Sequence, residues 1–382
     1  MKGAFLVCAA ALTLGLAVWP GSLLSHERVT TTVTYDREIV RIVNNKCIAC
    51  HSERNLGVPM TTYEETRPWA RAIQEEILSR HMPPWRAVPG YGHFANDVGL
   101  TIRERLLLIA WIEGSGPKTK TQSLIVNVDQ GQTPENERLT ADFERWQLGE
   151  PDVSKTLPVH SLAPGKGDGI RRVSVDLGLT ADTWIRALEF KPGDRRVVRA
   201  AFFSLEETGQ WLGSWTPWHG ITTLPENTAY RVPAVSHVVA EIHERSLHEA
   251  AEDRSRLGVY IAPGPPTYSP ADLVVRTKEQ KAERTRKFVG SLHLPSDFSL
   301  LAFRPEVRGV ESIEVIARKP DGATDVLLLV RDVLPEWPTP YILDKPVLLP
   351  RNTELRVTYS ASGADQEPSP ADFTFTASGY AR

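Results

Sequence analysis

Two of the three cysteines in this chain of 382 residues stand three positions apart, directly before a histidine. The motif reads Cys47-Ile48-Ala49-Cys50-His51. Two thiols at this spacing can each add to one vinyl group of a haem, and the histidine can reach the iron. The remaining cysteine, Cys8, leaves no pair for a structural disulfide elsewhere. The motif therefore predicts one covalently attached haem c.

Two other interpretations of the motif have less support from the sequence. A structural zinc site needs four ligands, and the sequence has no second cysteine pair. A redox-active C-x-x-C motif is expected in a βαβ setting, whereas the residues around this one have a helical pattern. Zinc binding and thiol redox chemistry therefore stay as alternatives to haem attachment.

The first 25 residues predict export. Lys2 precedes an apolar run over residues 3–24, which approaches the ~20 residues that span a bilayer. Small residues for a cleavage site are hard to place, so we expect a signal-anchor, with a cleaved signal peptide as the alternative. Either way Lys2 stays in the cytoplasm and the rest of the chain lies outside it. We expect a periplasmic protein anchored in a bacterial inner membrane through residues 3–24.

Composition limits the possible partners and domains. The chain has 44 basic and 47 acidic residues, a net charge of −3. No basic stripe is present, so nucleic acid is not an expected partner. About 355 residues remain after the N-terminal segment, which suggests two or three domains.

Residues 34–117 have helical patterning. The capping-box pair Thr62 and Glu65, followed by Pro68, predicts the start of a middle helix. A second capping box at Thr101 predicts a last helix that ends at Gly114. With the helix that precedes the cysteine motif, these elements predict an all-α haem-binding domain.

From residue 118 the pattern changes to short alternating runs typical of strands. Residues 171–175 and 355–359 alternate, and two runs flanking Pro320-Asp321-Gly322 predict a hairpin. This spacing indicates β-sandwiches. We expect two, over residues 118–277 and 288–382, with the charged run 278–287 as a solvated linker or exposed helix.

A low-spin haem needs a second axial ligand besides His51. The chain has three methionines, Met1, Met60 and Met82. Met82 precedes Pro83 and Pro84, whose fixed φ angles would hold its thioether rigidly. We predict Met82 as the sixth ligand. The alternatives are Met60 and two histidines, His81 and His93. A His/Met pair would raise the reduction potential relative to two histidines.

The helical part resembles a bacterial mono-haem cytochrome c domain of a particular kind. The resemblance rests on short motifs in order: Cys47-Ile-Ala-Cys-His51, Tyr63-Glu-Glu-Thr-Arg-Pro-Trp69-Ala, Met82-Pro-Pro-Trp85, Tyr91-Gly-His-Phe-Ala-Asn-Asp97 and Ala110-Trp111-Ile112. In such proteins a region similar to the copper type II, ascorbate-dependent monooxygenases often follows. These are the peptidylglycine-hydroxylating kind, with two jelly-roll-like domains and two copper sites.

Residues 146–359 are similar to those monooxygenases in outline. The markers are Lys191-Pro-Gly-Asp-Arg-Arg-Val-Val198, Ala240-Glu-Ile-His243, Asp253-Arg-Ser-Arg-Leu-Gly-Val-Tyr260 and Val307-Arg-Gly309. The resemblance implies an all-β region of two jelly-roll-like sandwiches. The motifs that carry this resemblance are less specific than the motifs of the cytochrome part.

The copper ligands that this resemblance implies are nearly all replaced. Arg199-Ala200 stands where the family has a histidine pair, and the third ligand of that site matches His243. At the other site Arg304 and Glu306 stand in a His-x-His position, and no methionine follows Met82. Arginine is always charged and only donates hydrogen bonds. We therefore expect no copper and no monooxygenase activity.

These features together predict an extracytoplasmic, membrane-associated mono-haem cytochrome c that carries single electrons and is not an enzyme. The β region would serve to dock it with redox partner proteins in a respiratory or photosynthetic membrane complex. One alternative is a haem-fed oxidoreductase with an active site in the β region. The other is a structural subunit whose haem is inert or absent.

Overall fold

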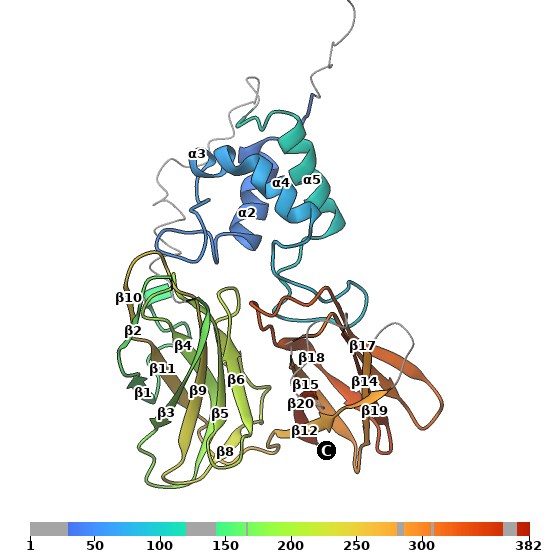
Figure 1. Ribbon diagram of the computed structural model, residues 1–382. Coiled ribbons are helices and arrows are strands. Elements are labelled where there is room, and N and C mark those ends of the chain that lie inside the picture. The colour runs from blue at the N-terminus through green and yellow to red at the C-terminus, as the bar shows by residue number, and fades with distance from the viewer. Residues whose placement is uncertain (1–29, 120–142, 166, 281–285, 307–308, 362–372) are drawn as a thin grey trace, which may run out of the picture.

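A helical unit stands at one end of two β-sandwiches that lie side by side (Figure 1). This computed structural model describes residues 30–119, 143–165, 167–280, 286–306, 309–361 and 373–382. Each of the three parts has its own hydrophobic core. The chain is thus mostly β after a short helical part, as the sequence predicts at this level.

The helical unit packs short helices around Ile39, Val43 and the fully buried Trp111. Its elements are η1 (Tyr35–Ile39), α2 (Val40–Lys46), α3 (Tyr63–Thr66), η2 (Arg67–Trp69), α4 (Ala70–Leu78) and α5 (Ile102–Glu113). The capping box of Thr101 and Glu104 is present, and Gly114 caps the C-terminus of α5, so both predictions are confirmed. At the middle helix the Thr62 side chain accepts from the Glu65 N–H. The Glu65 carboxylate accepts from the Thr61 N–H rather than from Thr62.

The first sandwich consists of two antiparallel sheets that share one core, which includes Ile185, Phe203, Ile242 and Leu257. One sheet has the order β1-β11-β4-β7, with β8 also paired to β4, and the other has the order β3-β9-β5-β6. A separate ribbon pairs β10 with β2. The strands are β1 (Val153–Thr156), β2 (His160–Leu162), β3 (Gly169–Asp176), β4 (Thr183–Lys191), β5 (Val198–Leu205), β6 (Trp211–Trp215), β7 (Ile221–Thr223), β8 (Tyr230–Val232), β9 (His237–Glu244), β10 (Ala251–Asp253) and β11 (Arg256–Ile261).

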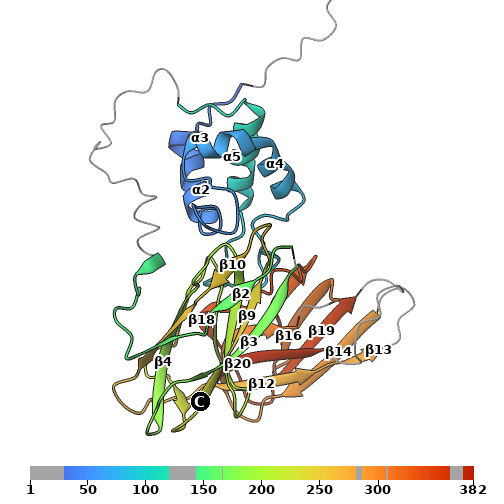
Figure 2. The same ribbon diagram turned by 60° about the vertical axis from the view of Figure 1, so that its left-hand side comes forward.

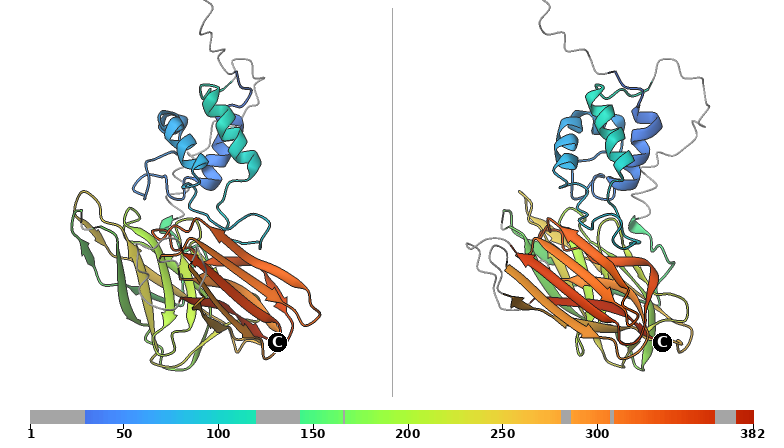
Figure 3. Two further views of the ribbon diagram at one scale, coloured as in Figure 1. Left: turned by 45° about the vertical axis from the view of Figure 1, so that its right-hand side comes forward. Right: turned by 90° about the vertical axis from the view of Figure 1, so that its right-hand side faces the viewer.

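The second sandwich has the sheet orders β12-β20-β15-β18 and β13-β14-β19-β16-β17. Phe303, Val315, Val357 and Phe375 lie in its core, and Figure 3 shows it beside the first sandwich. Its strands are β12 (Ala271–Arg276), β13 (Lys278–Gln280), β14 (Arg286–His293), β15 (Phe298–Pro305), β16 (Ser312–Arg318), β17 (Thr324–Arg331), β18 (Tyr341–Leu349), β19 (Glu354–Ala361) and β20 (Thr374–Ala381). The predicted hairpin is β16 and β17, with Gly322 at a positive φ of 87° in its turn.

The boundary between the sandwiches lies earlier than the sequence suggests. β12 pairs with β20 over Ala271–Arg276, and β13 pairs with β14. The second sandwich therefore begins by residue 271, and residues 278–280 are an edge strand rather than a linker or a helix. All three residues of β13 are exposed, and an exposed edge strand has the same charged composition as a linker.

The helical unit is also less self-contained than predicted. Residues 85–98 leave it and pack on the second sandwich, where Trp85, Ala87 and Val98 join the core. The Val88 N–H donates to Leu329 O at 2.7 Å. Figure 2 shows the helical unit seated on the ends of the sandwiches. The predicted domain 34–117 thus shares one of its loops with the β region.

The predicted signal-anchor at residues 1–25, with its apolar run 3–24, lies outside the described residues. Within the described parts of the chain, none of the helices combines the length and the apolar character that crossing a bilayer requires.

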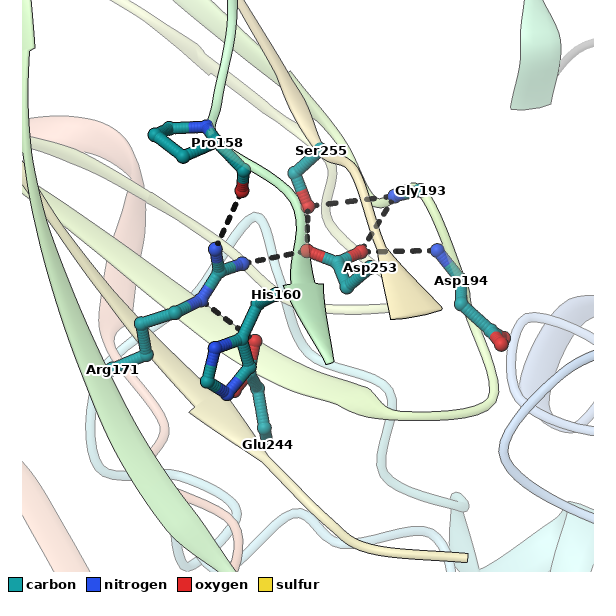
Figure 4. A network of polar contacts seen from close by, with 8 residues as sticks. All are labelled: Pro158, His160, Arg171, Gly193, Asp194, Glu244, Asp253 and Ser255. Carbon is teal, nitrogen blue, oxygen red and sulfur yellow. Dashed lines mark hydrogen bonds and ion pairs between the residues drawn. The ribbon is translucent and has the colours of Figure 1, made fainter. Parts of the chain in front are cut away.

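A buried ion network stabilises the end of the first sandwich that faces the helical unit (Figure 4). The fully buried Asp253 accepts from Arg171 Nη2 at 2.6 Å and from Ser255 Oγ at 2.7 Å. Its other oxygen accepts from the Gly193 and Asp194 N–H groups at 2.9 and 3.0 Å. One carboxylate therefore holds the loop that follows β4.

Removal of the Asp253 carboxylate should be strongly destabilising. Asp253→Ala removes the acceptor of Arg171 Nη2 and of the Asp194 N–H and leaves the Gly193 N–H only the longer contact with Ser255 Oγ at 3.4 Å. Because Arg171 then keeps its charge with one buried carboxylate fewer, we expect a loss of about 3–5 kcal/mol. Glu279→Ala, which breaks the exposed pair with Arg286, should cost about 1 kcal/mol or less. Chemical denaturation of both variants measures the difference, and equal losses would contradict the assignment of Asp253 as the anchor.

Candidate haem-binding site

The four predicted haem residues line one cavity of about 500 Å³. Cys47, Cys50 and His51 come from the segment after α2, and Met82 comes from the segment after α4. The volume lies in the range of cofactor sites, about 300–1,000 Å³. The chain thus brings two thiols, an imidazole and a thioether from separate segments to the same space.

The contacts of His51 favour the tautomer that a metal-binding imidazole needs. Its Nδ1 lies 3.0 Å from Val58 O, and because a carbonyl only accepts, Nδ1 carries the hydrogen. Nε2 is then left with a lone pair, as in histidines oriented for metal binding by an outer hydrogen bond. Burial lowers the pKa of His51, which favours the neutral ring.

The loop around His51 is fixed by backbone contacts. The Gly57 N–H donates to Cys50 O at 2.7 Å, and the Met60 N–H donates to His51 O at 2.9 Å. A Cβ atom on Gly57 would fall on the His51 ring, against Nδ1 and Cε1. Glycine at this position therefore leaves space for the imidazole.

The cysteines do not have the environment of redox-active thiols. Cys47 and Cys50 are half-buried and free. Burial raises the pKa of both thiols to about 12, whereas reactive thiols have a lowered pKa. In the described parts of the chain, no three side chains of His, Cys, Asp or Glu are grouped to hold a metal ion. Neither the thiol redox nor the zinc alternative gains support.

Two methionines reach the cavity, but in different settings. Met60 is only 7% exposed and belongs to the helical core. Met82 is partly exposed, lines the cavity beside Pro83 and Pro84, and belongs to no core cluster. His81 and His93 are exposed and do not line the cavity. His81 lies instead beside Ser79 and Glu76.

The β region supplies the opposite wall of the cavity, which the sequence did not indicate. Arg199, Trp218 and Arg245 come from the first sandwich, and Glu336 and Trp337 come from the loop between β17 and β18. The rings of Trp218 and Trp337 lie 6.0 Å apart between centroids. These contacts depend on the packing of three domains, so no local pattern could have revealed them.

His243 and Arg304, two positions that the sequence resemblance compares with copper ligands, belong to a charged cluster that joins the two sandwiches. His243 Nε2 lies 3.2 Å from Glu241 Oε1, and Arg304 Nη2 of the second sandwich lies 3.3 Å from the same oxygen. Arg172 Nη2 lies 2.8 Å from Glu241 Oε2. The hydrogen bond with His243 and the two arginines lower the pKa of Glu241 to about 2. Glu306 accepts from the Thr374 N–H.

No protein-family model and no curated protein matches this chain. Among solved structures, the major capsid protein P2 of bacteriophage PM2 is 12% identical, with a TM-score of 0.26, and the match covers 60% of this chain and 97% of the other. A peptide-N(4)-(N-acetyl-β-D-glucosaminyl) asparagine amidase is 11% identical, with a TM-score of 0.27 and coverage of 60% and 96%. The capsid of the virus PBCV-1 is 7% identical, with a TM-score of 0.24 and coverage of 59% and 94%.

Gly57→Ala should disturb the imidazole of His51, because the added methyl group occupies the position of the ring. Overpacking of this kind costs about 1–3 kcal/mol. We expect a lower thermal midpoint and a changed visible spectrum of the haem-loaded protein. Gly264→Ala is the matched control, since an added Cβ there meets nothing within 4 Å. If the two variants behave alike, the steric assignment is wrong.

Glu241→Gln should remove an acid-dependent part of the stability. The folded-state pKa of Glu241 lies below its ordinary value, so the carboxylate stabilises the fold above about pH 4.3 and this contribution disappears toward pH 2. The variant should therefore be less stable than wild type at neutral pH, with a difference that shrinks on acidification. Denaturant unfolding from pH 2 to 7 measures it. The control is Glu226→Gln in an exposed turn. Its free energy of unfolding should equal that of the wild type at each pH. A pH-independent difference would contradict this account.

Proposed function

We propose that the protein is an extracytoplasmic, membrane-associated mono-haem cytochrome c that carries single electrons. The observation that supports this most is the shared cavity lined by Cys47, Cys50, His51 and Met82. A bound haem would supply a one-electron couple between Fe(III) and Fe(II). The predicted export segment at residues 1–25 agrees with attachment outside the cytoplasm.

Each of the four predicted haem residues has a distinct role in this proposal. Cys47 and Cys50 would anchor a haem through thioether bonds, and His51, whose Nδ1 is held by Val58 O, would bind its iron. Met82 would supply the second protein ligand to the iron through its thioether. The Met60 N–H donates to His51 O, and the Met60 side chain belongs to the helical core, which supports the choice of Met82 over Met60.

In the same proposal the two jelly-roll-like sandwiches are a scaffold for docking, without copper and without catalysis. They would join the haem unit to redox partners in a respiratory or photosynthetic membrane complex. The cluster of Glu241, His243 and Arg304 supports this reading, since a carboxylate with a pKa of about 2 is a poor general base. Tight binding of one or two copper ions per chain after copper loading would instead favour a haem-fed oxidoreductase.

The choice of Met82 as the axial ligand can be tested by spectroscopy. The oxidised wild type should show the weak far-red band of thioether-to-iron ligation, and Met82→Ala should lose it. Its reduction potential should also fall, because methionine ligation raises the potential. Met60→Ala is the matched control and should keep the band. Loss of the band in Met60→Ala, with retention in Met82→Ala, would identify Met60 as the ligand.

A further inference from the structure

Two arginines of the first sandwich face the haem cavity. Arg199 lies on β5, and Arg245 directly follows β9. The charged residues that line the cavity are three cations and two carboxylates: Lys46, Arg199, Arg245, Glu76 and Glu336. The wall contributed by the β region is therefore the more cationic part of a site whose other residues are mostly apolar.

Arg199 has a donor without a partner. Its Nη1 donates to Asp168 Oδ2 at 2.6 Å and lies 3.4 Å from Glu336 O. Its buried Nε makes no hydrogen bond to any described residue. The guanidinium carbon lies 5.5 Å from the centroid of the Trp337 ring. The side chain is 17% exposed, and a buried donor of this kind costs free energy unless an acceptor meets it.

Among the described residues, Arg245 is held by backbone carbonyl groups and not by a carboxylate. Its Nε donates to Arg196 O at 2.7 Å, and its Nη2 donates to Leu56 O of the helical unit. Burial lowers the pKa of Arg245, and the positive charge of Arg199 lowers it further. Two cations thus lie near each other at the cavity, and their charge is incompletely balanced within the described residues.

We infer that Arg199 and Arg245 bind the two propionate groups of the haem, so that the first β-sandwich completes the haem site. This inference rests on the proposed haem attachment. The covalently held haem would bring two carboxylates into the cavity, and guanidinium groups match carboxylates through paired N–H donors. The pairing would give Arg199 Nε an acceptor and offset the two half-buried positive charges.

This placement has a consequence for the reduction potential. Oxidation of the haem adds one positive charge at the iron, and nearby cations oppose it in a site of low dielectric constant. Arg199 and Arg245 therefore favour Fe(II) and raise the potential. The β region sets the potential of a haem that is attached to another domain.

The experiment compares Arg199→Gln, Arg245→Gln and the double variant with Arg231→Gln. Arg231 is the matched control, since it loses the same charge from an exposed ion pair with Asp182 that does not line the cavity. Covalent haem content is measured by haem staining after denaturation, and midpoint potentials are measured between pH 5 and 8. Near-ultraviolet circular dichroism confirms that each variant is folded.

We expect wild-type haem content in all variants, with midpoint potentials that fall in both single variants and fall furthest in the double variant. The double variant should also show a potential that decreases as pH rises, because an unpaired propionate gains its negative charge in that range. The midpoint potential of the wild type should change little with pH, since the arginines keep the propionates ionised. Arg199→Lys keeps the positive charge, so its midpoint potential should fall less than the midpoint potential of Arg199→Gln.

Potentials and pH profiles equal to those of wild type and Arg231→Gln, at full haem content, would overturn this inference and leave the proposed cytochrome function intact. An equal fall in midpoint potential in Arg199→Lys and Arg199→Gln would also overturn the inference, because the positive charge of Arg199 would then not be what raises the potential. A wild type without covalent haem would instead refute the proposed function itself.

Discussion

The packing of Trp85 against the second sandwich is the interaction on which the cavity depends. Its ring centroid lies 5.2 Å from that of Tyr341 and 5.8 Å from that of Phe94, in edge-on arrangements. Aromatic contacts of this geometry are favourable beyond the area that they bury. Trp85 stands three residues after Met82, so this contact sets the position of the predicted thioether ligand. The wall of the cavity that contains Met82 is thus held by a β-sandwich rather than by the helical unit alone.

Charged groups of the first sandwich also contact the cysteine motif. Asp253 holds the loop after β4 through two backbone N–H groups, and this loop presents Arg195. Arg195 Nη2 donates to Ala49 O inside the cysteine motif, at 3.2 Å. Burial lowers the pKa of Arg195 to about 10. Asp253, the loop that contains Arg195 and the cysteine motif are therefore linked by successive contacts.

Local patterns predicted the local structure well. The capping box at Thr101 and the hairpin turn at Gly322 depend on a few adjacent residues, and both are present. The cysteine motif and Met82 could be picked out from the sequence because each is a chemical signature within its own segment, and the fold brings them to one cavity. The position of Arg199 and Trp337 at the cavity could not be predicted, since the contacts of Trp337 with Arg199 and with Trp218 join residues more than 100 positions apart. The edge strand at residue 278 was missed because a charged exposed strand and a linker have the same composition.

The most direct test of the central claim is the intact mass of the mature protein under denaturing conditions. If the cysteine motif attaches a haem, the wild type should have the mass of its polypeptide plus one haem, since thioether bonds survive unfolding. The double variant Cys47→Ala/Cys50→Ala should have the polypeptide mass alone. A wild type expressed with haem attachment available that nevertheless has only the mass of its polypeptide would contradict the account.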